Sequence, residues 1–171
     1  MPLEPLLRLV GVKVPLLATL AWACSGPPPR TANPTRPLDE RRAIEVISNA
    51  FKEEHEVPVP GSNVLLSAQS ALRVDVLASG KRFGVAYVTG AERSELGRAL
   101  PARDPNMGDA LQLVSGIGND ADARVCVLHD IDYLYDDQVG DAHEKSTSTA
   151  ELKLRRDTRD FLVIAHREHL R

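Results

Sequence analysis

Hydrophobic residues recur every three or four positions in two long parts of the chain. In residues 38–57 this spacing predicts an amphipathic helix, with Asp39 as its N-cap. In residues 146–169 it predicts a second amphipathic helix, whose outer face carries charges of both signs. Thr89 and Glu92 have the spacing of a capping box, which predicts a shorter helix between these two.

Other segments have the spacing of β-strands. Residues 72–78 alternate in polarity, and residues 83–88 are apolar on both faces; with the turn at Gly80 between them, the two segments predict a hairpin. In the first strand the alternation places three apolar side chains on one face: Leu72, Val74 and Val76. Residues 123–130 contain a continuous apolar run, which is typical of a strand in the middle of a sheet.

The order of these elements indicates the fold class. Residues 110–118 are apolar enough to predict one further helix, which Gly116 would end. The sequence therefore predicts an α/β or α+β fold over residues 38–171. We expect one compact domain, in which helices flank a small mixed sheet of three to four strands.

The N-terminus differs from the rest of the chain. Residues 1–23 have the organisation of a signal peptide, with basic residues first and then an uncharged apolar run that ends in small residues. Ala21, Trp22, Ala23 and Cys24 resemble the lipobox of bacterial lipoproteins, and this resemblance implies a lipid anchor on Cys24. Ala21-Trp22-Ala23 also fits ordinary signal-peptide cleavage without lipidation, and an uncleaved or misplaced start is the third alternative.

Residues 24–37 are rich in proline and have no apolar periodicity, so we expect an extended tether between the anchor and the domain. By the lipoprotein resemblance, the protein would be exported and held at a membrane of the bacterial envelope. Ser25 mildly favours the periplasmic side of the outer membrane, or an extracellular location, because it is not the aspartate that signals inner-membrane retention in enteric lipoproteins.

Composition excludes some partners. The formal net charge is −3, charges of both signs are mixed along the chain, and aromatic residues make up 4% of it. Such a chain has neither the basic surface that binds phosphate backbones nor the aromatic side chains on which bases stack. We therefore expect no nucleic-acid partner.

The sharpest chemical signal is the stretch HDIDYLYDD, residues 129–137, which directly follows the apolar run of residues 125–128. Asp130 and Asp132 resemble the divalent-metal motifs of nucleotide-sugar glycosyltransferases and of phosphatases with an aspartyl nucleophile. Carboxylates two positions apart at a strand end can bind a hard cation, and His129 lies next to them. The simpler interpretation is a solvated acidic turn with Tyr133 packed on the domain, and this interpretation is favoured.

Three other groups of residues are weaker candidates. His143 and Glu144 could join the acidic stretch in a transition-metal cluster, although the histidine spacing fits no known zinc pattern. Cys126, flanked by valines, is expected to be a buried thiol. Asp75 and Lys81 on the hairpin resemble part of the PD-(D/E)xK nuclease pattern, but the second strand has no acidic residue, so the resemblance implies at most an inactive relative. We expect Asp75 to pair with Arg73 or Lys81 on a solvated face.

Two classes of function follow from the sequence. The favoured one is a non-enzymatic envelope module that binds a protein, a cell-wall component or a small ligand, because no set of catalytic residues is complete. The alternative is a divalent-metal-dependent hydrolase or transferase that uses Asp130 and Asp132. A divalent cation is the one cofactor that the sequence suggests.

Overall fold

The structure is a computed structural model that describes residues 33–102, 111–136, 138, 145–168 and 170. Residues 33–171 form one compact unit of the chain. The predicted signal peptide, the lipidation site at Cys24 and most of the predicted tether lie outside the described residues, as do His143 and Glu144.

The fold is mixed α/β, and its largest sheet has five strands in the order β2-β5-β6-β8-β7. The strands are β2 (Pro58–Pro60), β5 (Val76–Ala78), β6 (Phe83–Val88), β7 (Gln112–Ser115) and β8 (Arg124–His129). β6 and β8 are parallel, and the other neighbours are antiparallel. The helices are α1 (Glu40–Glu53), α2 (Gly90–Leu96) and α3 (Thr147–Arg167).

Two smaller sheets and three short 3-10 helices complete the described fold. Strand β1 (Thr35–Pro37) pairs with β9 (Leu134–Asp136), and β3 (Asn63–Ser67) pairs with β4 (Ser70–Arg73). The 3-10 helices are η1 (Gly97–Ala99), η2 (Gly118–Asp120) and η3 (Asp130–Asp132). The end of the predicted tether thus forms strand β1, which pairs with the end of the acidic stretch.

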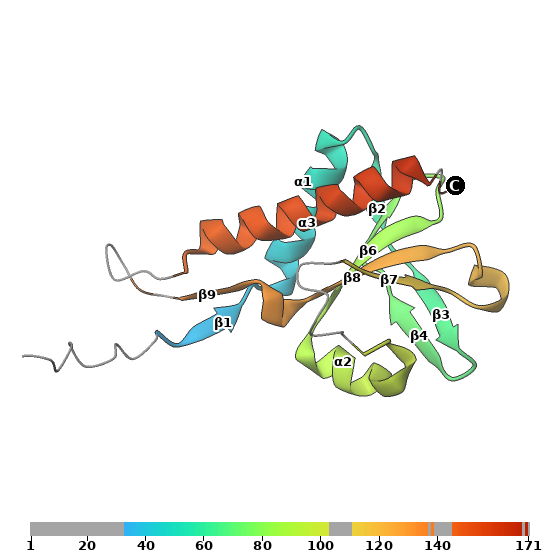
Figure 1. The fold of residues 1–171 in the computed structure, drawn as a ribbon, viewed down its shortest axis with the longest axis horizontal. Helices are drawn as coiled ribbons and strands as arrows, with labels where there is room; N and C mark the ends of the chain where they lie inside the picture. Colours follow the sequence, from blue (N-terminus) through green and yellow to red (C-terminus); the bar gives the residue numbers. More distant parts are fainter. Residues whose placement is uncertain (1–32, 103–110, 137, 139–144, 169, 171) are drawn as a thin grey trace, which may run out of the picture. The chain divides into compact units, whose positions relative to one another are not determined.

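Both faces of the five-stranded sheet are covered. Figure 1 shows α1 and α3 on one face, and α2 with the β3–β4 hairpin on the other. On β6 and β8, the side chains that face α1 and α3 are Phe83, Val85, Tyr87, Cys126 and Leu128. Those that face α2 and the β3–β4 hairpin are Ala86, Val88, Val125 and Val127. Burial on two sides explains why these strands have so few polar residues.

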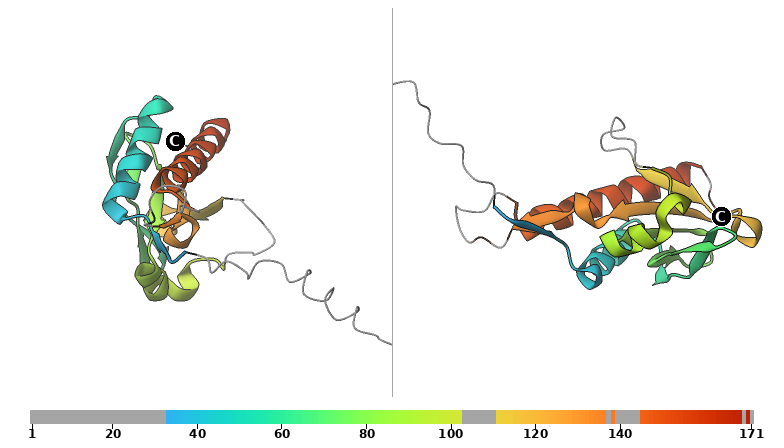
Figure 2. Two further views of the ribbon diagram at one scale, coloured as in Figure 1. Left: turned by 90° about the vertical axis from the view of Figure 1, so that its left-hand side faces the viewer. Right: turned by 90° about the horizontal axis from the view of Figure 1, so that it is seen from below.

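The two long helices lie next to each other, as the left view in Figure 2 shows. Three ion pairs join their exposed sides: Arg42 with Glu151, Arg155 with Glu53, and Arg159 with Glu54. Exposed pairs of this kind contribute little stability each. The apolar side chains beneath them, which include Ile47, Phe51, Leu154 and Phe161, form the main core.

The predicted helix in residues 110–118 is wrong, because Gln112–Ser115 form strand β7. A short apolar run fits a buried helix and a strand equally well, and here pairing with β8 decides. β7 and the proline-containing strand β2 are the two edges that bring the sheet to five strands, instead of the predicted three to four.

The predicted strand over residues 72–78 is interrupted. Its first part is β4, which pairs with β3, and its second part is β5 in the main sheet. Leu72 and Val74 therefore contact the α2 face, whereas Val76 contacts the α1 and α3 face. The prediction that these three side chains share one face was wrong.

The predicted caps are confirmed. The Asp39 carboxylate accepts hydrogen bonds from the first turn of α1, and Thr89 and Glu92 form the capping box of α2. Ser146 caps α3. Gly80 has a φ of +70°, a conformation that glycine adopts without strain, in the turn between β5 and β6.

Candidate functional site

The acidic stretch begins at the carboxyl end of β8, as the sequence predicts. His129 is buried, and its Nε2 lies 2.7 Å from Oε1 of Gln112 on the neighbouring strand β7. That amide also donates to the Pro101 carbonyl oxygen through Nε2, at 2.8 Å. His129 therefore takes part in a hydrogen-bond network between β8, β7 and the segment after η1.

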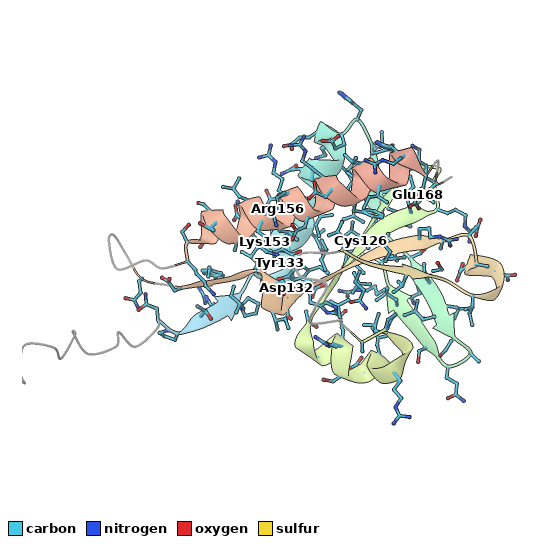
Figure 3. The ribbon with its side chains drawn as sticks, viewed as in Figure 1. Cys126, Asp132, Tyr133, Lys153, Arg156 and Glu168 are labelled. Carbon is cyan, nitrogen blue, oxygen red and sulfur yellow. The ribbon has the colours of Figure 1, made fainter. Side chains whose placement is uncertain are left out.

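Asp130 contacts the start of α2. The Gly90 N–H donates to its Oδ2 at 3.0 Å, and Gly90 is the first residue of that helix. A carboxylate at this position satisfies a free N–H of the first helical turn and interacts favourably with the helix dipole. Asp130 thereby joins η3 to α2. Asp132 is half-buried on the same 3-10 helix and directly precedes Tyr133, which Figure 3 labels beside it.

Asp136, at the end of β9, also binds backbone groups. The residue is buried, and its carboxylate accepts from the N–H groups of Lys145 at 2.7 Å and Gln138 at 3.0 Å. The Asp136 N–H donates to the Lys145 carbonyl oxygen in return. These bonds connect the end of β9 to the chain just before α3.

A buried polar cluster follows, which sequence reasoning missed. The Tyr133 hydroxyl donates to Oδ2 of Asp157 at 2.9 Å, and Lys153 Nζ donates to the same oxygen at 3.0 Å. Arg156 donates to Oδ1 at 3.0 and 3.1 Å. Burial and the Asp157 carboxylate both raise the pKa of Tyr133. Figure 3 shows Lys153 and Arg156 on α3 above Tyr133.

The sequence contained one signal for this cluster. Asp157 lies three residues after Leu154 and four before Phe161, both of which are on the apolar stripe of α3. An acidic residue on such a stripe is buried when the helix docks, so it needs partners.

These contacts bear on the predicted metal site. Among the residues that the structure describes, there is no group of three His, Cys, Asp or Glu side chains that could hold a metal ion. The structure brings together His129 and Gln112, and Asp130 and Gly90, instead of joining Asp130 and Asp132 with a third acidic group. The transition-metal cluster with His143 and Glu144 involves residues outside this part of the chain.

Asp75, the acidic residue of the nuclease-like pattern, is buried. Its side chain is 4% exposed, and its Oδ2 accepts from the Tyr87 N–H at 2.7 Å. Arg73 lies 3.3 Å from the other oxygen, 3.4 Å from Glu92, and in contact with Glu40. The pairing with Arg73 is confirmed, whereas the predicted solvated face is wrong because the carboxylate lies against the Tyr87 N–H and the Arg73 guanidinium, almost out of contact with water.

The nuclease pattern is not assembled around Asp75. On β6, Ala86 and Val88 are buried among apolar side chains on the α2 face. Within the described residues, the Arg73 guanidinium lies among the Asp75, Glu40 and Glu92 carboxylates, where it neutralises part of their charge. The arrangement is an ion-pair network that connects α1, β4 and α2.

Cys126 and Lys81, the two remaining candidate residues, make structural contacts. Cys126 is fully buried, as predicted, and burial raises the pKa of its thiol, which disfavours the reactive thiolate. Lys81 pairs with Glu56 at 2.6 Å, and His166 Nε2 lies 2.8 Å from the same Glu56 oxygen. This contact connects the β5–β6 turn to the last turn of α3.

In the described residues, none of the helices has the length and apolar character that crossing a bilayer requires. Comparisons with known proteins give no relative from which a family could be assigned: the chain matches no protein-family model, no curated protein and no solved structure.

Proposed function

We propose that the protein is exported to a bacterial envelope, is anchored there by a lipid on Cys24, and binds a partner through its folded part without catalysing a reaction. The N-terminal order of basic residues, apolar run, cysteine and proline-rich segment supports export and anchoring. An envelope protein or a cell-wall component is the expected partner.

The contact between Asp130 and the Gly90 N–H is the observation that carries the non-catalytic part of the proposal. A carboxylate that accepts from the first N–H of a helix has one oxygen already engaged, and this bond fixes the position of Asp130 against α2. Asp136 and Asp157 are likewise occupied with hydrogen-bond donors. Each of these acidic residues has a structural role, which favours a binding module over a metal-dependent hydrolase or transferase.

The outer face of α3 supports a protein partner. Leu152 is 62% exposed and Val163 is 45% exposed. Between them lies a hollow of about 420 Å³, whose lining includes Arg155, Arg156 and Arg159. Apolar side chains together with arginine are enriched in the buried centres of protein interfaces.

The first test is a calorimetric titration of the full chain with Ca²⁺, Mg²⁺, Mn²⁺ and Zn²⁺. We expect no difference between the wild type and the Asp130→Ala/Asp132→Ala variant, because Asp130 serves as a cap. Asp122→Ala/Asp160→Ala removes the same number of charges from exposed positions and is the matched control. If the wild type binds one of these cations with micromolar affinity, and Asp130→Ala/Asp132→Ala loses that binding while the control keeps it, the metal-dependent hydrolase or transferase becomes the favoured function.

The second test concerns the anchor. In a bacterial host, the wild type should partition into the detergent phase and gain the mass of a lipid modification. Cys24→Ser should move the protein to the aqueous phase or leave it unprocessed, because a lipid on this thiol would supply the membrane affinity. Equal partitioning of both proteins, without a change in mass, would contradict the lipid anchor.

A further inference from the structure

The two edges of the five-stranded sheet differ in their hydrogen-bonding capacity. At the β2 edge, the Gly61 N–H donates to Asp75 and the Ser79 N–H donates to Val57. Because backbone groups alternate in direction along a strand, Pro58 and Pro60 occupy the two positions of β2 that point away from β5. Proline has no N–H, so neither position can donate to another strand.

The β7 edge has no such protection. The Gly116 N–H donates to the Ala123 carbonyl oxygen. In an antiparallel pair every second residue is hydrogen-bonded to the partner strand, so Val114 and Gln112 are the residues of β7 that bond to β8. The N–H and C=O groups of Leu113 and Ser115 must then point away from β8. On the other side of β8, the Arg124 N–H donates toward β6, which agrees with this alternation.

The side chains of β7 also leave this edge accessible. Residues 111–117 include neither a charged residue nor a proline, the two devices that commonly prevent edge strands from pairing. Leu113 is 38% exposed. In the described part of the chain, β8 is the strand that pairs with β7. The accessible edge is short, because the Ile117 N–H already donates to Leu65.

We propose that β7 pairs with β7 of a second copy of this chain, antiparallel and about a two-fold axis. With Val114 facing the second copy's Val114, the Leu113 N–H donates to the second copy's Ser115 C=O, and the Ser115 N–H donates to the second copy's Leu113 C=O. The two-fold axis repeats both bonds, so four hydrogen bonds form. Every outward N–H and C=O group of Leu113 and Ser115 is then paired in both copies.

The β7 edge fits a second copy because it carries no charge and its outward N–H and C=O groups pair with those of an identical strand about a two-fold axis. The chain has a formal net charge of −3, so two copies repel each other weakly at most surfaces. An uncharged strand avoids that repulsion at the point of contact, and an identical strand is self-complementary only when the two pair antiparallel. Four hydrogen bonds and a small apolar contact predict a reversible dimer that depends on concentration.

The first measurement is the mass of the full chain by sedimentation equilibrium across a range of concentrations. The average mass of the wild type should rise from that of one chain toward that of two as the concentration increases. Leu113→Lys should raise the dissociation constant of the dimer at least about tenfold, because a charge at an edge opposes pairing. Val57→Lys is the matched control: Val57 is 64% exposed but directly precedes β2, at the opposite edge of the sheet, so its variant should behave like the wild type.

The second measurement is hydrogen exchange, which needs no substitution. The amides of Leu113 and Ser115 should gain protection as the concentration rises, whereas those of Gln112 and Val114 should be protected at every concentration. A mass of one chain throughout would overturn the proposal, as would equal weakening by both lysine variants. Protection of Leu113 and Ser115 that does not depend on concentration would also overturn it, because the edge would then be covered by another segment of the same chain.

Discussion

Replacing Asp157 by alanine is expected to lower the free energy of unfolding by about 3 kcal/mol. The buried carboxylate accepts from the Tyr133 hydroxyl, Lys153 and Arg156. In the variant, Lys153 and Arg156 can turn to water because both are partly exposed. The Tyr133 hydroxyl cannot, so it stays buried without its acceptor. Urea unfolding of the full chain, followed by circular dichroism, measures the loss.

A double-mutant cycle separates this cause from a general effect on α3. Tyr133→Phe removes the hydroxyl and should cost about 1 kcal/mol. The variant with both substitutions should be less destabilised than the sum of the two, since it leaves no unpaired hydroxyl. Asp160→Ala, an exposed position on the same helix, should change stability by less than about 0.5 kcal/mol. Additive losses would show that Tyr133 and Asp157 are not coupled.

The helices could be predicted because their signals are local. Asp39 and Ser146 mark the starts of α1 and α3, and the apolar spacing that follows each of them identifies the buried face. The capping box at Thr89 depends on a residue three positions away. Such signals lie within the helix itself and the residue before it, so tertiary contacts do not need to be known.

The edges of the sheet could not be predicted in the same way. Pro58–Pro60 has two residues that disfavour strands, and it pairs with β5 only because both prolines point outward. Residues 112–115 are too short and too uniformly apolar to distinguish a strand from a helix. Their conformation is determined by β8, which follows later in the chain.

The roles of the acidic residues depend on contacts that are distant in sequence. Asp130 meets the N–H of Gly90, forty residues earlier, and Tyr133 meets Asp157 on another element. Composition and spacing identify a concentration of carboxylates in this region. They do not show whether each carboxylate binds a cation or a backbone N–H, because only the packed fold determines the donors that surround it.

Replacing Asp75 by alanine is the second substitution for which we expect a large effect. It removes the acceptor of the Tyr87 N–H in the middle of β6 and leaves that donor buried. The expected loss is about 2 kcal/mol in the free energy of unfolding. Asp75→Asn keeps an oxygen for the Tyr87 N–H, so it should cost less than alanine. Thermal and urea unfolding of the three proteins compare these losses.

The pH dependence of the same comparison tests whether burial or the Arg73 ion pair dominates at Asp75. Burial raises the pKa of this carboxyl group above 3.8, and the Tyr87 N–H and Arg73 offset only part of that rise. The folded protein therefore keeps a proton that the unfolded chain has already lost, and stability must fall as the pH rises from 3.8 through the raised pKa. Asp75→Asn cannot titrate there, so the stability of the wild type relative to this variant should decrease over that range and then level off.

An ion pair strong enough to lower the pKa of Asp75 would give the opposite slope, with the relative stability of the wild type increasing with pH. Urea unfolding at a series of pH values therefore separates the two cases by the sign of one slope.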